Sequence, residues 1–276
     1  MFKKKNFIYI AIFSLILSSC SQYQKTLSKG TVAEQYQLAV KLYEAKKYNK
    51  ALNLFEKITP SYRGKGQMER IQFMVAQANF NIKSYDLSGY YYERFAQNYP
   101  RSSKKEEAAY LSAYSYMLAA PRYNLDQTET LKALDAFQNF INTYPDSKRL
   151  PEANKYYQEI RYKLQKKAFE IAKVYYTTAA TDPRNYKAAI VAFDNMLEEY
   201  LGSEFKEEAL YYRLKAAHDL AVKSTIRRKA ERIKEAVLAY EKLIRNFPKS
   251  KFLEDSKKLV ANLEKEKKKL ETLTKS

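Results

Sequence analysis

The stretch at residues 133–147 reads ALDAFQNFINTYPDS, and its internal spacing recurs along the chain. A small residue, Ala133, is followed four positions later by the aromatic Phe137 and eight positions after that by Pro145. Further copies of this frame begin at Ala51, Ser88, Ala189 and Ala236. A frame repeated at intervals of tens of residues indicates a repeat architecture, so the repeat is the first constraint on the fold.

Two copies depart from the frame at the proline. Leu201 takes its place in the copy that begins at Ala189, and Pro60 comes early in the first copy. We expect Pro60 to end its helix, because proline lacks the N–H donor that a continuing helix needs. The first residues of the copies are 37, 45, 56 and 47 positions apart, which predicts lengthened helices or insertions in the later repeats.

Apolar residues at three- and four-residue spacing predict an all-α fold of five helix pairs and a final helix. The first helix starts at 31 and breaks at 46–48. The others are expected at about 51–58, 67–82, 85–98, 104–119, 126–143, 150–179, 186–200, 205–222, 226–246 and 252–273. The last helix is predicted to cap the final repeat. Because it is rich in lysine, it could instead lie on an anionic lipid leaflet.

The first twenty residues resemble a targeting signal. Lys3, Lys4 and Lys5 precede an apolar run at 7–17, and the run ends in Leu-Ser-Ser-Cys at 17–20. This pattern predicts a signal peptide at 1–19, and it resembles a lipobox in which Cys20 is lipidated. A plain signal peptide with a chance cysteine is the alternative. Cys20 is the single cysteine of the chain, which excludes a disulfide framework.

We therefore divide the chain into a removed signal at 1–19, a lipidated tether at 20–30, an N-terminal half at 31–145 with repeats 1–3, and a C-terminal half at 146–276 with repeats 4–5 and the basic cap. The formal charge is +19. In an exported protein the expected partners of such a basic surface are anionic lipid, acidic proteins or acidic substrates rather than nucleic acid. The alternative is a solvated basic surface without a specific partner.

A serine followed five residues later by an acid marks each later junction. The serines are Ser102, Ser147, Ser203 and Ser250. Serine near a helix start can cap free N–H groups, so we interpret these pairs as structural.

The sequence offers no catalytic constellation. His218 is the single histidine and lies in a helical pattern, so it is interpreted as a packed helix residue. No phosphate loop or metal-ligand spacing occurs. We expect no catalytic residue, no metal and no cofactor apart from the covalent lipid on Cys20.

The repeated frame resembles the second helix of a tetratricopeptide repeat, a helix pair of about 34 residues that stacks into a superhelix. The lipobox followed by five such repeats is similar to the BamD family of outer membrane lipoproteins in the β-barrel assembly machinery. The most specific stretches are LDQT at 125–128, EIRYKL at 159–164 and YKAAIVAFDNMLEEYLGS at 186–203. Leu201 and the long basic segments at 225–236 and at the C-terminus depart from the family pattern.

The resemblance implies a non-catalytic scaffold that is anchored in the outer membrane and faces the periplasm. The partners it implies are the periplasmic domains of the central β-barrel assembly protein, unfolded outer membrane proteins, accessory lipoproteins and outer membrane lipid. A tetratricopeptide adaptor for cell-wall synthesis or envelope integrity is the alternative, and an enzyme is a distant third.

Tetratricopeptide arrays bind peptides along their first helices, so the register of the frame predicts a peptide groove. Its candidates are Tyr36, Val40, Tyr43, Phe73, Gln77, Phe80, Tyr110, Tyr114 and Met117. The competing interpretation is that these side chains belong to the core. Arg161 is the candidate for docking the barrel partner, and an intramolecular ion pair is its alternative.

Overall fold

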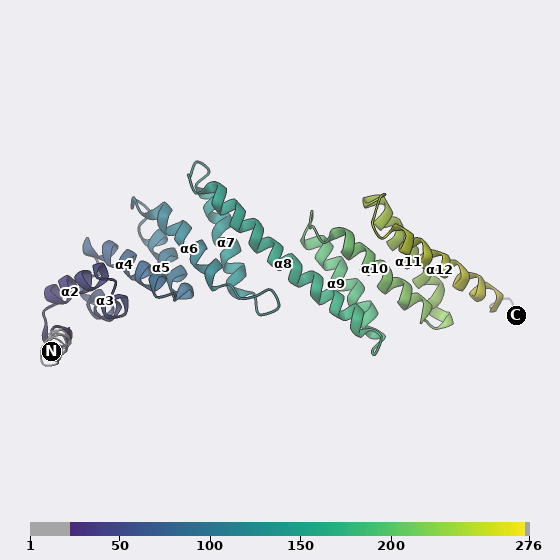
Figure 1. Ribbon diagram of the computed structural model, residues 1–276, viewed down its shortest axis with the longest axis horizontal. Coiled ribbons are helices and arrows are strands. Elements are labelled where there is room, and N and C mark those ends of the chain that lie inside the picture. Colours follow the sequence, from purple (N-terminus) through teal and green to yellow (C-terminus); the bar gives the residue numbers. More distant parts are fainter. Residues whose placement is uncertain (1–22, 274–276) are drawn as a thin grey trace, which may run out of the picture. The chain divides into compact units, whose positions relative to one another are not determined.

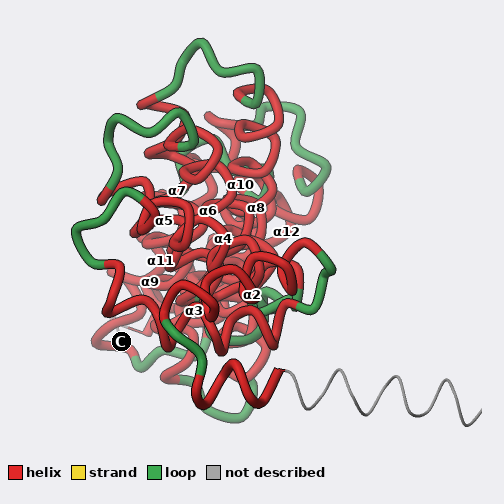
Figure 2. The backbone as a smooth tube through the Cα atoms, turned by 90° about the vertical axis from the view of Figure 1, so that its left-hand side faces the viewer, coloured by secondary structure: helices red, strands yellow, loops and turns green. Residues whose placement is uncertain are grey.

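The computed structural model describes residues 23–273, which form helices and turns without a strand (Figure 1). The helices are α2 (Val32–Glu44), α3 (Tyr48–Tyr62), α4 (Gln67–Asn81), α5 (Tyr85–Asn98), α6 (Lys105–Ala119), α7 (Thr128–Thr143), α8 (Leu150–Thr178), α9 (Arg184–Glu199), α10 (Lys206–Val222), α11 (Ile226–Asn246) and α12 (Leu253–Leu273). Figure 2 shows the short loops that join them. The predicted all-α repeat fold is confirmed.

Each helix packs on its neighbours in the chain. Helix α3 contacts α2 and α4, and α5 in the same way contacts α4 and α6. The second helix of a pair thus lies between its own first helix and the next one. These nearest-neighbour contacts bury apolar side chains between the packed helices.

The repeated frame forms this core. Its small residues are fully buried, namely Ala51, Ser88, Ala133, Ala189 and Ala236. Its aromatic residues Phe55, Phe137 and Phe193 are also fully buried, and Tyr92 is 1% exposed. The small side chain lets two helices approach, and the aromatic ring fills the space beside them.

The proline of the frame fixes the end of the second helix. Tyr99 and Tyr144 precede prolines and adopt ψ of 66° and 62°, outside the helical region that proline disfavours in the preceding residue. Tyr200 adopts the same ψ of 66° although Leu201 follows it. There Gly202 has a φ of +81°, a conformation that glycine adopts at no steric cost. Glycine therefore turns the chain where the frame lacks proline.

The prediction that Pro60 ends its helix is wrong. Helix α3 contains Pro60 and continues to Tyr62. Tyr62 is 9% exposed, and its ring lies 5.3 Å from that of Tyr36 on α2. Packing of Tyr62 stabilises the final turn despite the donor that proline lacks.

The predicted tether at 20–30 also needs correction, because residues 23–29 are helical. Tyr23 is 8% exposed and packs with Leu27 on the core of α2 and α3. Gln35 donates hydrogen bonds to the carbonyls of Thr26 and Leu27, both at 3.2 Å. The segment is part of the folded repeat array. Cys20 and the predicted signal lie outside the described residues.

The junction serines accept hydrogen bonds from free backbone N–H groups near the helix starts, as predicted, and three of them also join neighbouring repeats. Ser102, Ser147 and Ser203 each accept a hydrogen bond from the backbone N–H two residues further on. Their hydroxyls donate to the side chains of Glu69 at 2.6 Å, Glu106 at 2.6 Å and Gln165 at 3.0 Å. At Ser250 the preceding repeat contributes Glu207, which accepts from the N–H of Lys251. We call these four contacts, one at each of Ser102, Ser147, Ser203 and Ser250, the serine joints.

The chain forms two compact units. One comprises residues up to Pro121 together with Gln127–Ile160, and the other comprises Arg122–Asp126 and Arg161–Ser276. The boundary thus falls inside α8 rather than at the predicted 145/146. Residues 122–126 join the second unit because Lys166 lies over the ring of Tyr123 at 4.6 Å and Lys167 donates to the carbonyl of Leu125.

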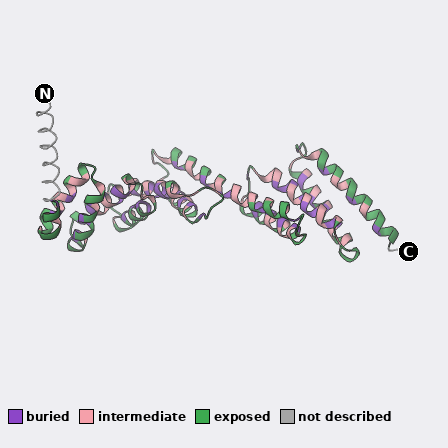
Figure 3. Ribbon diagram, turned by 60° about the horizontal axis from the view of Figure 1, so that its bottom comes forward, coloured by how far each residue is buried: buried purple, intermediate pink, exposed green. Residues whose placement is uncertain are grey.

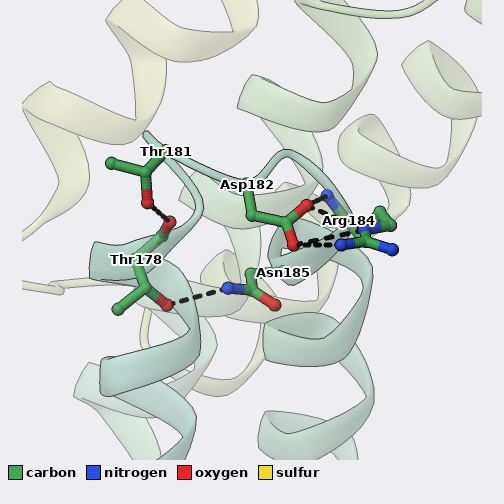
Figure 4. Close-up of polar contacts among 5 residues, drawn as sticks. All are labelled: Thr178, Thr181, Asp182, Arg184 and Asn185. Atoms are coloured by element: carbon green, nitrogen blue, oxygen red, sulfur yellow. Dashed lines mark hydrogen bonds and ion pairs between the residues drawn. The ribbon is translucent and has the colours of Figure 1, made fainter.

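The turn between α8 and α9 is held by its own side chains (Figure 4). Asp182 accepts from the backbone N–H of Arg184 at 3.1 Å and pairs with its guanidinium at 2.8 Å. Asn185 donates to the hydroxyl of Thr178 at 3.0 Å. Hydrogen bonds from Arg184 lower the pKa of Asp182. Arg184 is 90% exposed, so this ion pair shapes the turn more than it stabilises the unit.

Helix α12 covers α10 and α11, as predicted for a cap. Figure 3 shows this last helix mostly in the colour of exposed residues, and its buried residues are Ser256, Leu263 and Leu270. Because these leucines are in the protein core, they are not available to enter a lipid interface. Contact of the lysine-rich outer side of α12 with an anionic leaflet stays a prediction. Among residues 23–273 we find no helix with the length and hydropathy needed to cross a bilayer.

His218 connects α10 to the cap. One ring nitrogen contacts Asp219 at 2.8 Å, and the other contacts the amide oxygen of Asn262 on α12 at 2.9 Å. Tyr176 donates to Asp219 at 3.1 Å. Burial alone would lower the pKa of His218, but the hydrogen bonds with Asp219 and Asn262 and the charges of Asp219 and Glu266 raise it.

This raised pKa predicts a pH dependence of stability. A histidine whose pKa is higher in the folded state contributes stability fully below pH ~6.5, and the contribution is lost as pH rises through the folded pKa. We expect the urea midpoint of the C-terminal unit to fall between pH 6 and 8, and we expect His218→Gln to flatten that slope. Because the chain has one histidine, its imidazole resonance reports the pKa directly. An equal slope in both proteins would contradict the assignment.

Candidate peptide groove

The first helices α2, α4 and α6 of the N-terminal unit carry the predicted groove residues. Eight of the nine candidates are partly exposed, as a contact surface requires. The exception is Tyr110, which is 4% exposed. The register of the frame thus selects partly exposed side chains on α2 and α4, whereas on α6 it selects one core residue, Tyr110.

A pocket of about 510 Å³ brings three of the candidates together. Tyr43 comes from α2, whereas Phe73 and Gln77 come from one face of α4. Glu44, Glu69, Arg70 and Lys104 also line it. The pocket therefore combines an aromatic wall with charges of both signs.

Tyr43 and Gln77 connect the two helices. The Tyr43 hydroxyl donates to the amide oxygen of Gln77 at 2.5 Å. Burial, with a smaller contribution from Tyr48, raises the pKa of Tyr43 to about 12. Tyr43 is therefore a neutral hydrogen-bond donor over the physiological pH range. The amide N–H groups of Gln77 have no acceptor among the hydrogen bonds of the described residues, so they can bind a peptide carbonyl.

Phe73 forms the floor of the pocket. Its ring packs edge-on against Tyr92 at 5.6 Å and against Phe95 at 5.2 Å. Lys104 lies over the same ring at 5.4 Å and pairs with Glu107 at 2.7 Å. A ring fixed in this way offers a rigid apolar contact, which costs little entropy when a ligand binds.

A series of rings continues the same face across three first helices. Phe80 on α4 lies 6.1 Å from Tyr114 on α6, and Tyr114 lies 5.4 Å from Tyr156 on α8. Phe80 and Tyr114 are predicted groove candidates, whereas the frame did not give Tyr156. Tyr156 was missed because α8 is too long to count back from Ala189 in the standard register. Its signal is an aromatic residue three positions after Ala153, a buried small residue.

The prediction that Tyr110 lines the groove is wrong, because its ring lies in the interface of α6 and α7. Its ring packs against Phe140 at 5.5 Å and Phe137 at 6.3 Å. The guanidinium of Arg149 covers it at 4.7 Å. Arg149 thus takes the contact surface that the register assigned to a ligand.

The other candidates lie on the same helices but not in the pocket. Tyr36 and Val40 pack partly on the core of α2 and α3. Met117 is partly exposed in the last turn of α6. The charged pocket residues Arg70 and Lys104 were missed, since charge on a helix surface gives no positional signal by itself.

Arg161 lies in α8 within the C-terminal unit and is partly exposed. The positive charge of Arg161 acts on the hydroxyl of Tyr200. The pKa of Tyr200 is raised to about 12, because burial and Glu199 raise it by more than Arg161 lowers it. Arg161 therefore has an intramolecular partner, and its docking role stays a prediction. Within the described residues no cluster of three or more His, Cys, Asp or Glu side chains is suited to a metal ion.

Comparison with known proteins places this arrangement in a family. The model of the outer membrane lipoprotein family YfiO matches residues 28–232, and a tetratricopeptide repeat model matches residues 224–250. The chain is 26% identical over 259 residues to the outer membrane protein assembly factor BamD of Rickettsia prowazekii, covering 92% of this chain and 95% of that protein. It is 23% identical to BamD of Pasteurella multocida over 81% of this chain and 90% of that protein. It is 25% identical to BamD of Buchnera aphidicola over 82% and 95%.

Proposed function

The chain belongs to the YfiO family of outer membrane lipoproteins, and from that membership we propose that it is a non-catalytic scaffold in outer membrane protein assembly. Its relatives are named as outer membrane protein assembly factors, which supports the same role here. In this proposal Cys20 carries the lipid anchor, no cofactor is needed, and the repeats face the periplasm.

We propose that the N-terminal groove recruits unfolded outer membrane proteins. The observation that carries this proposal is the pocket of Tyr43, Phe73 and Gln77, beside the ring series that continues from Phe80. A strand with alternating aromatic residues presents one ring every second residue, about 6.6 Å apart. Rings spaced along three first helices suit such a strand, and the Gln77 amide suits its backbone.

The C-terminal unit is proposed to dock onto the periplasmic domains of the central barrel protein, with Arg161 as a contact. Accessory lipoproteins are further proposed partners. Co-purification of a large barrel protein from detergent-solubilised outer membranes tests this docking. Recovery of cell-wall enzymes alone would instead favour the adaptor interpretation.

The groove is tested by placing a charge in the pocket. Gln77→Arg is expected to weaken photo-crosslinking to nascent barrel peptides roughly tenfold, because it removes the amide contact and fills the pocket with a longer side chain. The matched control is Gln72→Arg, which lies on α4 but lines a different pocket with Tyr90 and Tyr91. Crosslinking is measured with a photoreactive residue near the peptide terminus, and circular dichroism checks the fold.

Equal crosslinking by Gln77→Arg and the unaltered protein would overturn the groove assignment. Equal loss in both arginine variants would show that added charge, rather than the pocket, causes the effect. That result would also count against the proposed site.

A further inference from the structure

Pockets in equivalent positions lie between consecutive second helices of the repeats. One lies between α3 and α5, over α4, and encloses about 450 Å³. Another lies between α5 and α7, over α6, and encloses about 520 Å³. A further one lies between α9 and α11, over α10, and encloses about 400 Å³. The repeat places all of them, so their different linings reflect the sequence and not the architecture.

The pocket between α9 and α11 differs from the others in charge. In the α3–α5 pocket Glu56 balances Arg94. The α5–α7 pocket has two cations and two carboxylates. The α9–α11 pocket has two carboxylates and five cations, and the cations are Lys187, Arg213, Arg228, Arg232 and Lys242. We call this last pocket, with the residues that line it, the basic groove.

Two of the five cations are neutralised by neighbouring carboxylates. Arg213 donates two hydrogen bonds to Asp194, at 2.6 and 2.9 Å. Arg228 pairs with Glu231 at 3.3 Å, and both of these side chains are more than half exposed. These two ion pairs therefore add no net charge to the basic groove.

The other three cations carry the excess charge. Arg232 donates to a neutral acceptor, the hydroxyl of Ser224, at 2.6 Å. Lys187 and Lys242 are exposed, and neither forms an ion pair with the residues that the structure describes. In the lining of the groove, Glu235 is the carboxylate that remains to offset these three cations. The basic groove is therefore electrostatically complementary to anions.

Exposed apolar side chains lie among these charges. Val191 on α9 is 49% exposed, and Leu238 on α11 is 53% exposed. Ile190 and Leu220 line the same groove and are partly buried. Cations beside exposed aliphatic groups are typical of peripheral contact with a bilayer, where the cations reach headgroup phosphates and the aliphatic groups reach the acyl boundary. Because lysine is depleted in protein–protein interfaces, an acidic protein fits this groove less well.

The lysine-rich helix α12 is less suited to such a contact. Lys257 pairs with Glu254 at 2.8 Å, and Lys258 pairs with Asp255 at 3.3 Å. These lysines are therefore neutralised by acids of their own helix. The basic groove, in contrast, keeps an excess of positive charge beside exposed aliphatic side chains.

We propose that the basic groove binds the headgroups of anionic phospholipid at a bilayer surface. Its three cations without a carboxylate partner contact the phosphates, and Val191 and Leu238 lie against the acyl boundary. The chain belongs to a family of outer membrane lipoproteins, so a lipid surface is present where it acts. This contact is additional to the lipid anchor proposed at Cys20. It depends neither on the peptide groove nor on docking to a barrel protein.

The test measures how the mature chain, from residue 20 on and with Cys20→Ser, partitions into vesicles. This chain contains every helix of the structure and lacks acyl chains, which would bind a vesicle by themselves. The vesicles are phosphatidylcholine with or without phosphatidylglycerol, at physiological ionic strength. We expect binding to the anionic vesicles only. Lys187→Gln combined with Lys242→Gln should weaken it roughly twentyfold, since each cation near an anionic leaflet contributes a factor of about five.

The matched control removes two lysines from α12. Lys257→Gln combined with Lys258→Gln changes the net charge equally, at exposed positions outside the groove, and we expect little change in partition. Val191→Ser combined with Leu238→Ser leaves the charge unaltered and should weaken partition about tenfold, because apolar contact is lost. Circular dichroism checks the fold of each variant.

The proposal is wrong if the chain binds both kinds of vesicle equally or binds neither, and the second result would favour an acidic protein as the occupant. Equal losses in the two lysine pairs would assign the effect to net charge rather than to the groove. Unchanged partition of the serine variant, or release of the chain by soluble glycerol phosphate, would show that a phosphate anion suffices without a bilayer. Crosslinking of barrel peptides should be unaffected by the Lys187 and Lys242 changes, so failure of this site and failure of the peptide groove are distinguishable.

Discussion

Replacing Gly89 with valine is expected to destabilise the N-terminal unit by about 3 kcal/mol, because the new side chain has no space. A Cβ at Gly89 would meet two atoms of the Tyr116 ring at 2.6 Å. That ring is 5% exposed, and its hydroxyl donates to Glu93 at 2.9 Å, so it cannot move aside without losing this hydrogen bond. The Gly89 carbonyl also accepts from Ser112 at 2.8 Å, which fixes the distance between α5 and α6.

The matched control is Gly66→Ala. A Cβ at Gly66 would have no atom within 4 Å, and its φ of −58° suits any residue. Urea unfolding followed by circular dichroism should show a large drop in midpoint for Gly89→Val and little change for Gly66→Ala. A midpoint near that of the unaltered protein for Gly89→Val would mean that α5 and α6 separate easily.

Phe137→Ala is expected to cost about 3–5 kcal/mol, the range for removing a fully buried phenylalanine. Phe137 is 0% exposed, and its ring lies 6.3 Å from Tyr110 and 5.8 Å from Tyr156. Tyr240 occupies the same position of the frame but is only partly buried. Tyr240→Ala should therefore cost about 1 kcal/mol.

Comparing these two variants tests whether burial or position in the frame determines the energetic contribution. Each variant is followed by urea unfolding, with the slope of the transition checked against that of the unaltered protein. Similar losses in the two variants would show that the frame position itself, rather than local burial, sets the stability.

The fold could be predicted because the frame encodes packing directly. A small residue such as Ala133 and an aromatic one such as Phe137, four positions apart, lie on the same side of a helix and enter the same core. The helix ends were harder to predict. Pro60 stays inside α3 because of a contact between Tyr62 and Tyr36, which are distant in sequence. Residues 23–29 form a helix too short to show a periodic pattern.

The site was predictable in part for a similar reason. Counting along α2 and α4 found Tyr43, Phe73 and Gln77, since those helices keep the standard register. The same count failed at Tyr110, because Arg149 from the next repeat covers that ring. It also could not find Tyr156, since the 29-residue α8 does not follow the repeat length. Side chains contributed by a neighbouring repeat are not visible in the pattern of one repeat.

The serine joints have a consequence for how the array adapts. They link the later repeats, but the connection between α3 and α4 runs through residues 63–66, where the chain reads RGKG and has no serine. The groove pocket lies beside this connection, and the hydrogen bond from Tyr43 to Gln77 crosses it. Across this connection the first two repeats are therefore held by the shared apolar core of α2, α3 and α4 and by the Tyr43–Gln77 hydrogen bond, rather than by a serine joint.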